Sequence, residues 1–262
     1  MKNKEVINHI VNWLKSYAQD NKMKGFVVGV SGGIDSALTS TLCAKTGLPT
    51  LCLEMPIKQQ QSQVDRAQEH IRWLRKHHTN VAEKMVLLYP VFDALSKAVE
   101  ADEQKNEDLL SLANTRARLR MVTLYYYAAC KRYLVAGTGN KVEDFGVGFY
   151  TKYGDGGVDL SPIADLSKTQ VRALASTLGV DQKILNAPPT DGLWDDGRND
   201  EEQLDATYEQ LEWAMTQHAA GKSPADFVGE NARVFEVFLS HHNANKHKME
   251  PIPVCSIPKQ LL

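Results

Sequence analysis

The sequence predicts an α/β fold, a doubly wound parallel sheet flanked by helices and followed by extra C-terminal helices. Two observations carry this prediction. Short segments that are apolar throughout, such as 26–30 and 50–55, alternate with segments of helical periodicity, and strands without polar alternation are typical of a parallel sheet covered on both faces. The chain after residue 168 is mainly helical in pattern. We expect one domain spanning residues 1–262.

The first half of the chain alternates helices and strands. Residues 3–19 have apolar side chains at helical spacing. A strand at 26–30 leads through a glycine turn into a helix that ends near Thr46, because Gly47 and Pro49 follow. The next elements predicted are a strand at 50–55, a helix at 62–78, a strand at 85–89 and a helix at 91–99.

The second half begins with a long helix, predicted at 108–132, and a fourth strand at 133–137. Three more helices are expected at 168–178, 201–218 and 224–242. Between the first two of these lies 186–200, rich in Pro, Gly and Asp, which we interpret as a mobile loop over the active site. The tail, 251–262, contains three prolines and is expected to be extended.

The composition excludes several classes of protein. A net charge of −2 over 262 residues provides no basic surface for nucleic acid. No apolar run approaches the length needed to span a membrane, and the N-terminus lacks an apolar signal core, so we expect a cytoplasmic protein. The four cysteines have no Cys-x-x-Cys spacing and are expected to be buried free thiols: Cys43, Cys52, Cys130 and Cys255.

The most informative segment runs from strand to helix through Ser31-Gly32-Gly33-Ile34-Asp35-Ser36. Glycine permits positive φ and close approach of a ligand, and the unpaired N–H groups of the helix start favour an anion. The pattern lacks the Gly-Lys-Ser/Thr of a Walker A loop and the Gly-x-Gly-x-x-Gly spacing of a dinucleotide fingerprint. An ordinary tight turn is the alternative, but the two serines and Asp35 favour a phosphate site that carries a divalent cation.

The loop resembles the pyrophosphate loop of the ATP pyrophosphatase superfamily, whose members cleave ATP between the α and β phosphates. Three later segments narrow the resemblance: Asn-Thr-Arg-Ala-Arg-Leu-Arg at 114–120, Gly-Thr-Gly-Asn-Lys-Val-Glu at 137–143, and Tyr-Thr-Lys-Tyr-Gly-Asp-Gly-Gly-Val-Asp at 150–159. Together with the loop they closely resemble the NAD synthetase family over about residues 5–250. The third segment is the most specific to this family, whereas the Gly-Thr-Gly-Asn turn alone is weak evidence for it.

The resemblance implies an adenine nucleotide alpha hydrolase-like fold and a ligase reaction. Deamido-NAD, ATP and ammonia give NAD, AMP and pyrophosphate, with Mg²⁺ as cofactor and a homodimer whose active site lies at the subunit interface. A carboxylate resists attack by an amine, so adenylation of the nicotinate carboxylate supplies the leaving group. A glutaminase domain would need a nucleophilic cysteine and a few hundred further residues, and we expect none in this chain.

The resemblance also implies residue roles. ATP would be bound by Gly29, Val30, Ser31, Gly32, Gly33, Ile34, Asp35, Ser36, Thr138, Lys168 and Thr190. Deamido-NAD would be bound by Asn114, Arg118, Lys152, Asp155, Asp159, His247 and Lys248. Asp35 and Glu143 match the magnesium ligands, and Lys168 matches a lysine that neutralises phosphate charge. Glu54 stands where some relatives have arginine, so the adenine contact is assigned to the backbone of Met55. We interpret Asp155 as the group that takes a proton from ammonium.

Less specific interpretations exist for most of these residues. Arg116, Arg118 and Arg120 could form a solvated helix face, and Lys168 could be an ordinary surface lysine. The histidines at 241, 242 and 247 have poor spacing for a metal. Alternative functions are another pyrophosphate-loop enzyme, such as a tRNA lysidine or thiolation enzyme or GMP synthetase, and a non-catalytic adenine-nucleotide sensor. A basic surface or catalytic cysteines would mark the tRNA enzymes, and failure to turn ATP over to AMP would mark the sensor.

Overall fold

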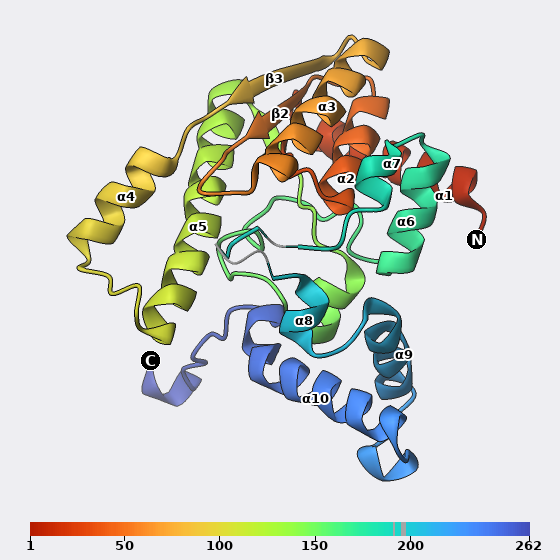
Figure 1. Cartoon of the computed structure of the whole chain (residues 1–262), viewed down its shortest axis with the longest axis vertical. Helices are drawn as coiled ribbons and strands as arrows, with labels where there is room; N and C mark the ends of the chain where they lie inside the picture. Colours follow the sequence, from red (N-terminus) through yellow and green to blue (C-terminus); the bar gives the residue numbers. More distant parts are fainter. Residues whose placement is uncertain (191, 195–197) are drawn as a thin grey trace.

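A four-stranded parallel sheet forms the centre of the molecule in a computed structural model that describes residues 1–190, 192–194 and 198–262 (Figure 1). The strand order is β3–β2–β1–β4. Their bounds are Gly25–Gly29 for β1, Thr50–Glu54 for β2, Val81–Met85 for β3 and Tyr133–Val135 for β4. From β1 the chain adds β2 and β3 on one side and then β4 on the other, so the direction of winding reverses between β1 and β4. Ligands in such sheets bind at this point of reversal.

Helices cover both faces of the sheet, as the doubly wound prediction requires. Phe26 and Val28 of β1 pack with α1, α2 and α6 on one face, and α3 continues this layer beside α2. Val27 points to the other face, where α4 and α5 cover it (Figure 1). The helices span Asn3–Asp20 (α1), Ile34–Lys45 (α2), Gln61–His77 (α3), Tyr89–Ala98 (α4), Asn106–Lys131 (α5), Lys168–Thr177 (α6) and Gln182–Leu185 (α7).

The C-terminal helices build a separate apolar cluster below the sheet (Figure 1). It is centred on Tyr208, Phe235 and Phe238, all nearly inaccessible to solvent. A π-helical turn, η1, joins the cluster to the strand ends. The elements are η1 (Val142–Val147), α8 (Asp200–Leu204), α9 (Tyr208–Ala219), the 3₁₀ turn η2 (Pro224–Asp226) and α10 (Glu230–Met249).

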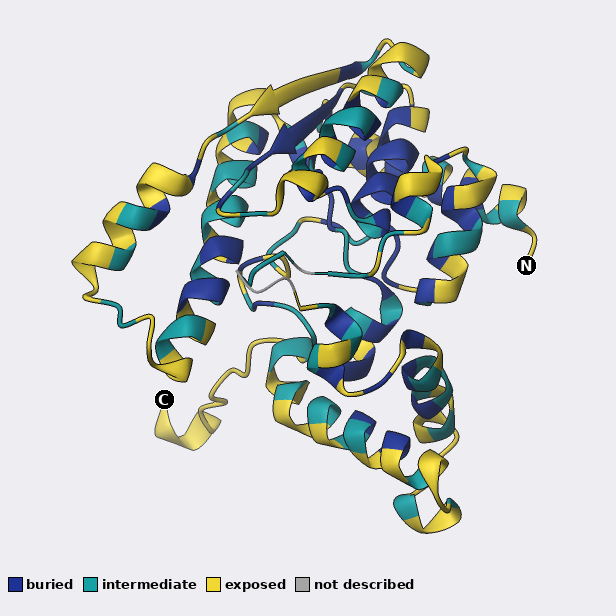
Figure 2. Cartoon of the chain, in the orientation of Figure 1, coloured by how far each residue is buried: buried dark blue, intermediate teal, exposed yellow. Residues whose placement is uncertain are grey.

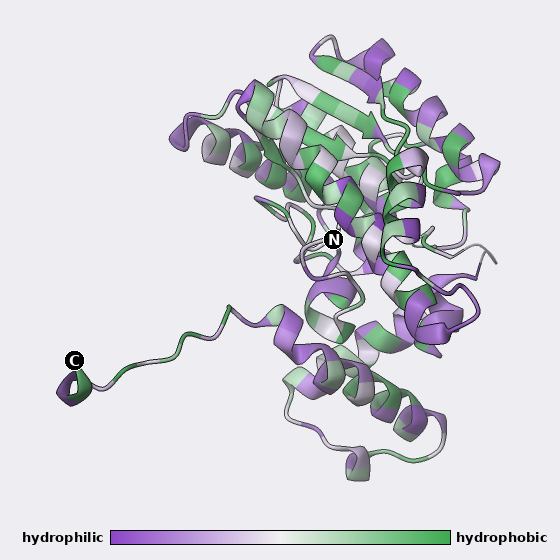
Figure 3. Cartoon of the chain, turned by 90° about the vertical axis from the view of Figure 1, so that its left-hand side faces the viewer, coloured by the Kyte–Doolittle hydropathy of each residue, from purple (hydrophilic) through white to green (hydrophobic). Residues whose placement is uncertain are grey.

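The tail follows α10 as an extended segment that leaves the body of the molecule (Figure 3). All residues from 251 to 262 are exposed, and the last of them form a short 3₁₀ turn, η3 (Lys259–Leu261). The expectation of an extended tail is therefore confirmed.

The prediction of the third strand was wrong by four residues. The strand is Val81–Met85, paired with β2 from Thr50↔Val81 to Glu54↔Met85, whereas 85–89 was expected. As an edge strand it is largely exposed (Figure 2), so it lacks the continuous apolar run used to find it. The apolar run instead leads into α4, and its Leu88 packs into the core.

The helices expected at 201–218 and 224–242 also differ from the structure. The first is broken between α8 and α9, where Asp205 has a positive φ and Thr207 caps α9 by accepting a hydrogen bond from the Gln210 N–H. The second starts at Glu230, after Gly229 with φ +60°, and continues to Met249. The strand β4 ends at Val135, two residues earlier than expected. Neither α7 nor the π-helical turn η1 was predicted.

Two of the four cysteines are buried and two are exposed. Cys43 and Cys52 are buried as expected, but Cys130 and Cys255 are exposed, because one lies on the outer side of α5 and the other in the tail. Among the described residues, none of the helices is both long and apolar enough for a membrane span.

Candidate active site

The loop between β1 and α2 folds around its own hydroxyl groups. Ser36 Oγ donates to the Gly33 carbonyl (2.9 Å) and accepts from the Ser31 N–H (3.2 Å), while the Gly33 N–H donates to Ser31 Oγ (3.2 Å). Gly32 has φ +84°, and a Cβ there would lie 2.3 Å from the Gln63 carbonyl oxygen. The N-cap residue of α2 is Gly33, which has no side chain with which to cap the helix. The loop therefore presents backbone N–H groups at a helix N-terminus, which is suited to an anion.

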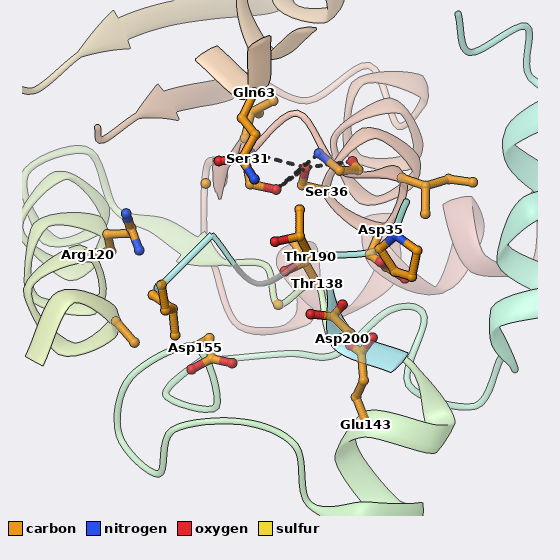
Figure 4. A pocket seen from close by; sticks show the side chains of 18 of the residues that line it. Ser31, Asp35, Ser36, Gln63, Arg120, Thr138, Glu143, Asp155, Thr190 and Asp200 are labelled. Atoms are coloured by element: carbon orange, nitrogen blue, oxygen red, sulfur yellow. Dashed lines mark hydrogen bonds between the residues drawn. The ribbon is translucent and has the colours of Figure 1, made fainter. Parts of the chain in front are cut away.

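The loop forms one wall of a cavity at the carboxyl ends of the strands (Figure 4). Residues from distant parts of the chain complete it, including Glu143 from η1, Asp155 from the 150–159 segment and Lys168 from the start of α6. Of the predicted ATP contacts, the cavity is lined by Gly29, Val30, Ser31, Gly33, Ile34, Asp35, Ser36, Met55, Thr138, Lys168 and Thr190. Gly32 is not among the lining residues; it lies in the turn, against α3.

Lys168 lies between two carboxylates. Its Nζ is 2.6 Å from Asp35 Oδ2 and 3.1 Å from Glu143 Oε1, and the side chain is only 3% exposed. Burial by itself lowers the pKa of Lys168, but the neighbouring Asp35 and Glu143 more than offset this and raise the pKa above its usual value. Lys168 is therefore a buried ammonium and not a surface lysine.

Two further residues complete this cluster, and sequence reasoning missed both. The Tyr208 hydroxyl lies 2.6 Å from Glu143 Oε1 and 3.3 Å from Asp200 Oδ2, and the Lys168 Nζ lies 4.5 Å from the centre of the Tyr208 ring. Burial, then Glu143 and Asp200, raise the pKa of Tyr208, so its hydroxyl stays protonated. Asp200 and Tyr208 belong to α8 and α9, where no motif marked them.

Asn140 links the Asp35 carboxylate to the backbone of Glu143 and is also a residue that the site predictions omitted. It is fully buried; its Nδ2 donates to Asp35 Oδ1 (3.2 Å), and its Oδ1 accepts from the N–H groups of Val142 and Glu143. The Gly-Thr-Gly-Asn turn contains it, so its presence in that motif was the available signal. Asn140 orients Asp35 and begins η1, which holds Glu143.

Asp155 lies where this cavity meets a second hollow, which is lined by Asp144, Tyr150, Lys152 and Lys248 among others. Asp155 Oδ1 accepts from the Thr151 N–H (2.9 Å). The Thr151 hydroxyl in turn donates to Asn114 Oδ1 (2.7 Å), so Asn114 supports this segment from α5 and does not line either hollow.

The second hollow holds an unusual carboxyl group. Asp144 has its pKa raised to about 8 by burial and then by the carboxylates of Glu143, Asp155 and Asp35. The Asp144 side chain packs against Gly139, and a Cβ on residue 139 would leave the carboxyl group no room.

The predicted lysine contacts meet the end of α10. Lys152 Nζ donates to the His247 carbonyl (3.0 Å), and Lys248 Nζ donates to the Tyr150 carbonyl (2.8 Å). Burial lowers the pKa of Lys248, although Asp155 opposes the shift. His247 is exposed and its ring Nδ1 lies 3.2 Å from the Ala244 carbonyl within the helix. Lys152 and Lys248 therefore join α10 to the 150–159 segment.

Like Asn114 and His247, the predicted substrate contacts Asp159 and Arg118 line neither hollow. Asp159 accepts hydrogen bonds from the Tyr125 hydroxyl (3.0 Å) and the Val135 N–H (2.8 Å), so it ties the segment to the sheet. Arg118 is exposed and lies 3.4 Å from the Lys152 carbonyl. The solvated helix face considered for the arginines is wrong for Arg116, which is buried and donates to the Leu193 carbonyl, and for Arg120, which donates to the Met55 carbonyl.

The described part of the 186–200 loop runs beside the cavity. Ala187, Thr190 and Leu193 line it, and the Thr190 hydroxyl accepts from the Gly192 N–H (3.2 Å). Residues 191 and 195–197, on which part of the mobile-loop prediction falls, lie outside the described residues, so that prediction stays untested.

A family model described as NAD synthase matches residues 6–252. The chain belongs to the NAD synthase family. Its relatives include the NH(3)-dependent NAD(+) synthetase of Carboxydothermus hydrogenoformans, 36% identical over 86% of this chain and 90% of that protein. The Asp35–Glu143–Lys168 cluster and the 31–36 loop thus lie in the cavity of a NAD synthase-family fold.

Two solved structures are similar to the chain over almost its full length. One is the NMN synthetase from Francisella tularensis, with a TM-score of 0.85, 33% identity and coverage of 98% of this chain and 100% of that one. The other is the NH3-dependent NAD synthetase from Campylobacter jejuni, with a TM-score of 0.77, 24% identity and the same coverage. At this identity the second supports the fold alone, and both agree with the predicted adenine nucleotide alpha hydrolase-like fold.

Proposed function

We propose that this chain is an ammonia-dependent NAD synthetase, which joins ammonia to deamido-NAD at the expense of ATP and releases NAD, AMP and pyrophosphate. One observation carries the proposal within this family: the 31–36 loop and the Lys168 cluster line the same cavity. A loop for phosphates and a buried cation beside it are what cleavage between the α and β phosphates requires.

The reaction divides into two displacements. The nicotinate carboxylate attacks the α-phosphorus of ATP and pyrophosphate leaves, held by the N–H groups at the start of α2 and the Ser31 and Ser36 hydroxyls. The product is a mixed anhydride. Ammonia then attacks its carbonyl carbon, and AMP leaves with the electron pair of the broken C–O bond. Lys168 lines the cavity and is long enough to pair with phosphate charge that develops in the first step.

Mg²⁺ is the proposed cofactor, held by Asp35 and Glu143. Oxygens of both carboxylates already converge on one cation, the Lys168 Nζ, at 2.6 and 3.1 Å. The described residues contain no cluster of three or more His, Cys, Asp or Glu suited to a metal, and Mg²⁺ needs none, because it retains several waters and takes one or two carboxylates plus phosphate oxygens. When bound, the ion neutralises phosphate charge and orients the leaving pyrophosphate.

Asp155 is the proposed acceptor of the proton from ammonium, since it lines both the ATP cavity and the second hollow. Its position suits transfer at the junction where the activated carbonyl would meet ammonia. We expect Asp155→Asn to lower the ammonia-dependent rate at pH 7.5 by about 10²-fold. An unchanged rate would remove Asp155 from this role.

We propose that two copies of the chain form a homodimer through the outer face of α5. Val122 and Tyr126, one turn apart, are 58% and 63% exposed, and the opposite face of the helix packs on the sheet. A helix that is apolar on both sides is typical of one buried on both sides. Light scattering should give about twice the chain mass of 29.2 kDa, and a monomer at micromolar concentration would contradict the proposal.

A second candidate is synthesis of NMN, the mononucleotide. The similarity to the Francisella tularensis NMN synthetase favours it, at 33% identity and a TM-score of 0.85. The chemistry at the carboxylate is the same for both acids, which differ only in that deamido-NAD carries an AMP unit on the 5′-phosphate of the mononucleotide. Comparison of kcat/KM for nicotinic acid mononucleotide and deamido-NAD under identical conditions decides between them.

The test of the proposed function is product analysis with purified protein, ATP and Mg²⁺. Deamido-NAD with ammonium should give NAD, AMP and pyrophosphate in equal amounts, and glutamine in place of ammonium should give no NAD. A higher kcat/KM for the mononucleotide would establish the second candidate. Absence of AMP with both acids would contradict both functions and leave the nucleotide-sensor interpretation.

A further inference from the structure

The buried ammonium of Lys168 lies at a position where a lysine is costly to the fold. It is the first residue of α6, after Ser167, which caps the helix. The N-terminus of a helix carries partial positive charge, so it disfavours a cation, and burial adds a desolvation cost. Contacts with Asp35 and Glu143 offset these costs. The requirements of a helix start therefore do not explain a lysine at this position, whereas its contacts with the two carboxylates do.

The carboxyl groups outnumber the ammonium. Asp35, Glu143 and Asp200 all act on Lys168, and Tyr208 contributes only a neutral hydroxyl. When ionised, Asp35 and Glu143 carry two negative charges against the single positive charge of Lys168, and their side chains are only 17% and 15% exposed. A divalent cation in place of the ammonium would neutralise both carboxylates, whereas a divalent cation added while the ammonium stayed between them would put two cations side by side.

Lys168 and a divalent cation cannot hold the same oxygens at once. The Lys168 Nζ occupies the position between Asp35 Oδ2 and Glu143 Oε1 at hydrogen-bond distances. A magnesium ion bound to the same oxygens needs distances of about 2.0–2.1 Å and would repel the ammonium. The lysine side chain is flexible enough to turn from the carboxylates toward the phosphate side of the cavity that it also lines.

We infer that Lys168 is a stand-in cation, which keeps Asp35 and Glu143 together while no metal is bound and yields them to a divalent cation when one arrives. The inference rests on the proposed function for the identity of the metal. It assigns Lys168 a positioning role before catalysis, in addition to any contact with phosphate. Tyr208 and Asn140 hold the two carboxylates in place during the exchange through their hydrogen bonds.

The test measures binding of Mn²⁺ alone, by electron paramagnetic resonance, in the absence of nucleotide. Lys168→Met should bind Mn²⁺ at least about 10-fold more tightly than the wild type, because the competing ammonium is gone. The gain should disappear in the double variant Lys168→Met/Asp35→Asn. The matched control is Lys141→Met, which removes a lysine from an exposed pair with Asp165 (2.9 Å) and should bind Mn²⁺ as the wild type does. Equal or weaker Mn²⁺ binding by Lys168→Met overturns the inference.

Thermal unfolding supplies an independent readout. Lys168→Met should melt below the wild type in metal-free buffer, since its carboxylates face one another unpaired, and Mn²⁺ should raise its Tm far more than that of the wild type. If Lys168→Met does not accumulate as folded protein, Lys168→Gln replaces it in both measurements, and affinity equal to the wild type overturns the inference. Neither readout requires NAD formation, so failure of the proposed function leaves the result interpretable.

Discussion

The 31–36 loop and the Lys168 cluster lie on the same cavity but are built in opposite ways. The loop is one contiguous segment whose hydrogen bonds are formed within six residues. The cluster brings together Asp35, Glu143, Lys168 and Tyr208, which are separated by up to 173 residues in sequence and are held by the sheet on one side and the C-terminal helices on the other. Local motifs can encode phosphate binding, whereas the charge balance of the site depends on packing between two apolar clusters.

The largest effect is expected at the residue shared by both regions. Asp35→Asn should lower AMP formation by at least about 10³-fold, equivalent to about 4 kcal/mol in the barrier, because the proposed metal site would lose one of its two carboxylates. The fold should persist, since Lys168 keeps its contact with Glu143. Steady-state AMP release measures the effect, and circular dichroism checks the fold. Asp165→Asn, at an exposed carboxylate, is the matched control. A near-normal rate for Asp35→Asn would show that the loop works without the cluster.

The next effect separates the stability of the two regions. Phe235→Ala should cost about 3–5 kcal/mol, because a fully buried ring leaves a cavity among Trp213, Phe227 and Phe238. Hydrogen exchange should then accelerate in α9 and α10 and much less in β1 and α2. The matched variant Phe26→Ala, in the sheet core, should accelerate exchange throughout the chain. Uniform acceleration in Phe235→Ala would mean that the two clusters unfold as one unit.

A pH effect should arise from the layer behind the loop. His70 is buried on α3, its Nε2 lies 3.0 Å from Ser40 Oγ of α2, and burial lowers its pKa to about 4. The unfolded chain takes up a proton below its ordinary pKa of about 6.5 while the folded chain does not, so stability present above that pH is lost as the pH falls toward 4. The loss from this group should be about 3 kcal/mol.

Urea unfolding from pH 7 to pH 4 measures this loss as the difference between the wild type and His70→Gln, which should depend less on pH. Parallel curves for the two proteins would show that His70 is not held neutral by the packing of α3 on α2.

The smallest effect is chemical and leaves stability unchanged. Cys130 and Cys255 are exposed in the single chain and should react with a thiol reagent in the native monomer, whereas in the proposed homodimer Cys130, one turn from Tyr126 on α5, should react more slowly. Cys43 and Cys52 should not react, because they are buried and burial raises the pKa of both thiols, that of Cys52 to about 12. Titration at concentrations where the chain is monomeric should count two fast thiols and four after unfolding, and Cys130→Ser/Cys255→Ser should have no fast thiols. Four fast thiols in the wild type would mean that α2 and β2 open readily.

The sequence by itself determined the features that depend on neighbouring residues. The apolar strands β1 and β2, the turn with Gly32 at positive φ, and helices α1 to α6 follow from local pattern, and most of the predicted ATP contacts line the cavity because one loop supplies them. The edge strand β3 was misplaced because its exposed residues carry no apolar signal, and the break between α8 and α9 was missed because only the capping geometry marks it.

Only the tertiary structure decided which charged groups meet. Asp155 and Asp159 were both predicted to contact deamido-NAD, yet Asp159 anchors the chain to β4 and Asp155 lines the cavity. Asp200 and Tyr208 had no motif at all, and they reach Glu143 because the C-terminal helices pack against η1. The physical reason is that a buried charge requires partners in space, and the chain can supply them from any distance along its sequence.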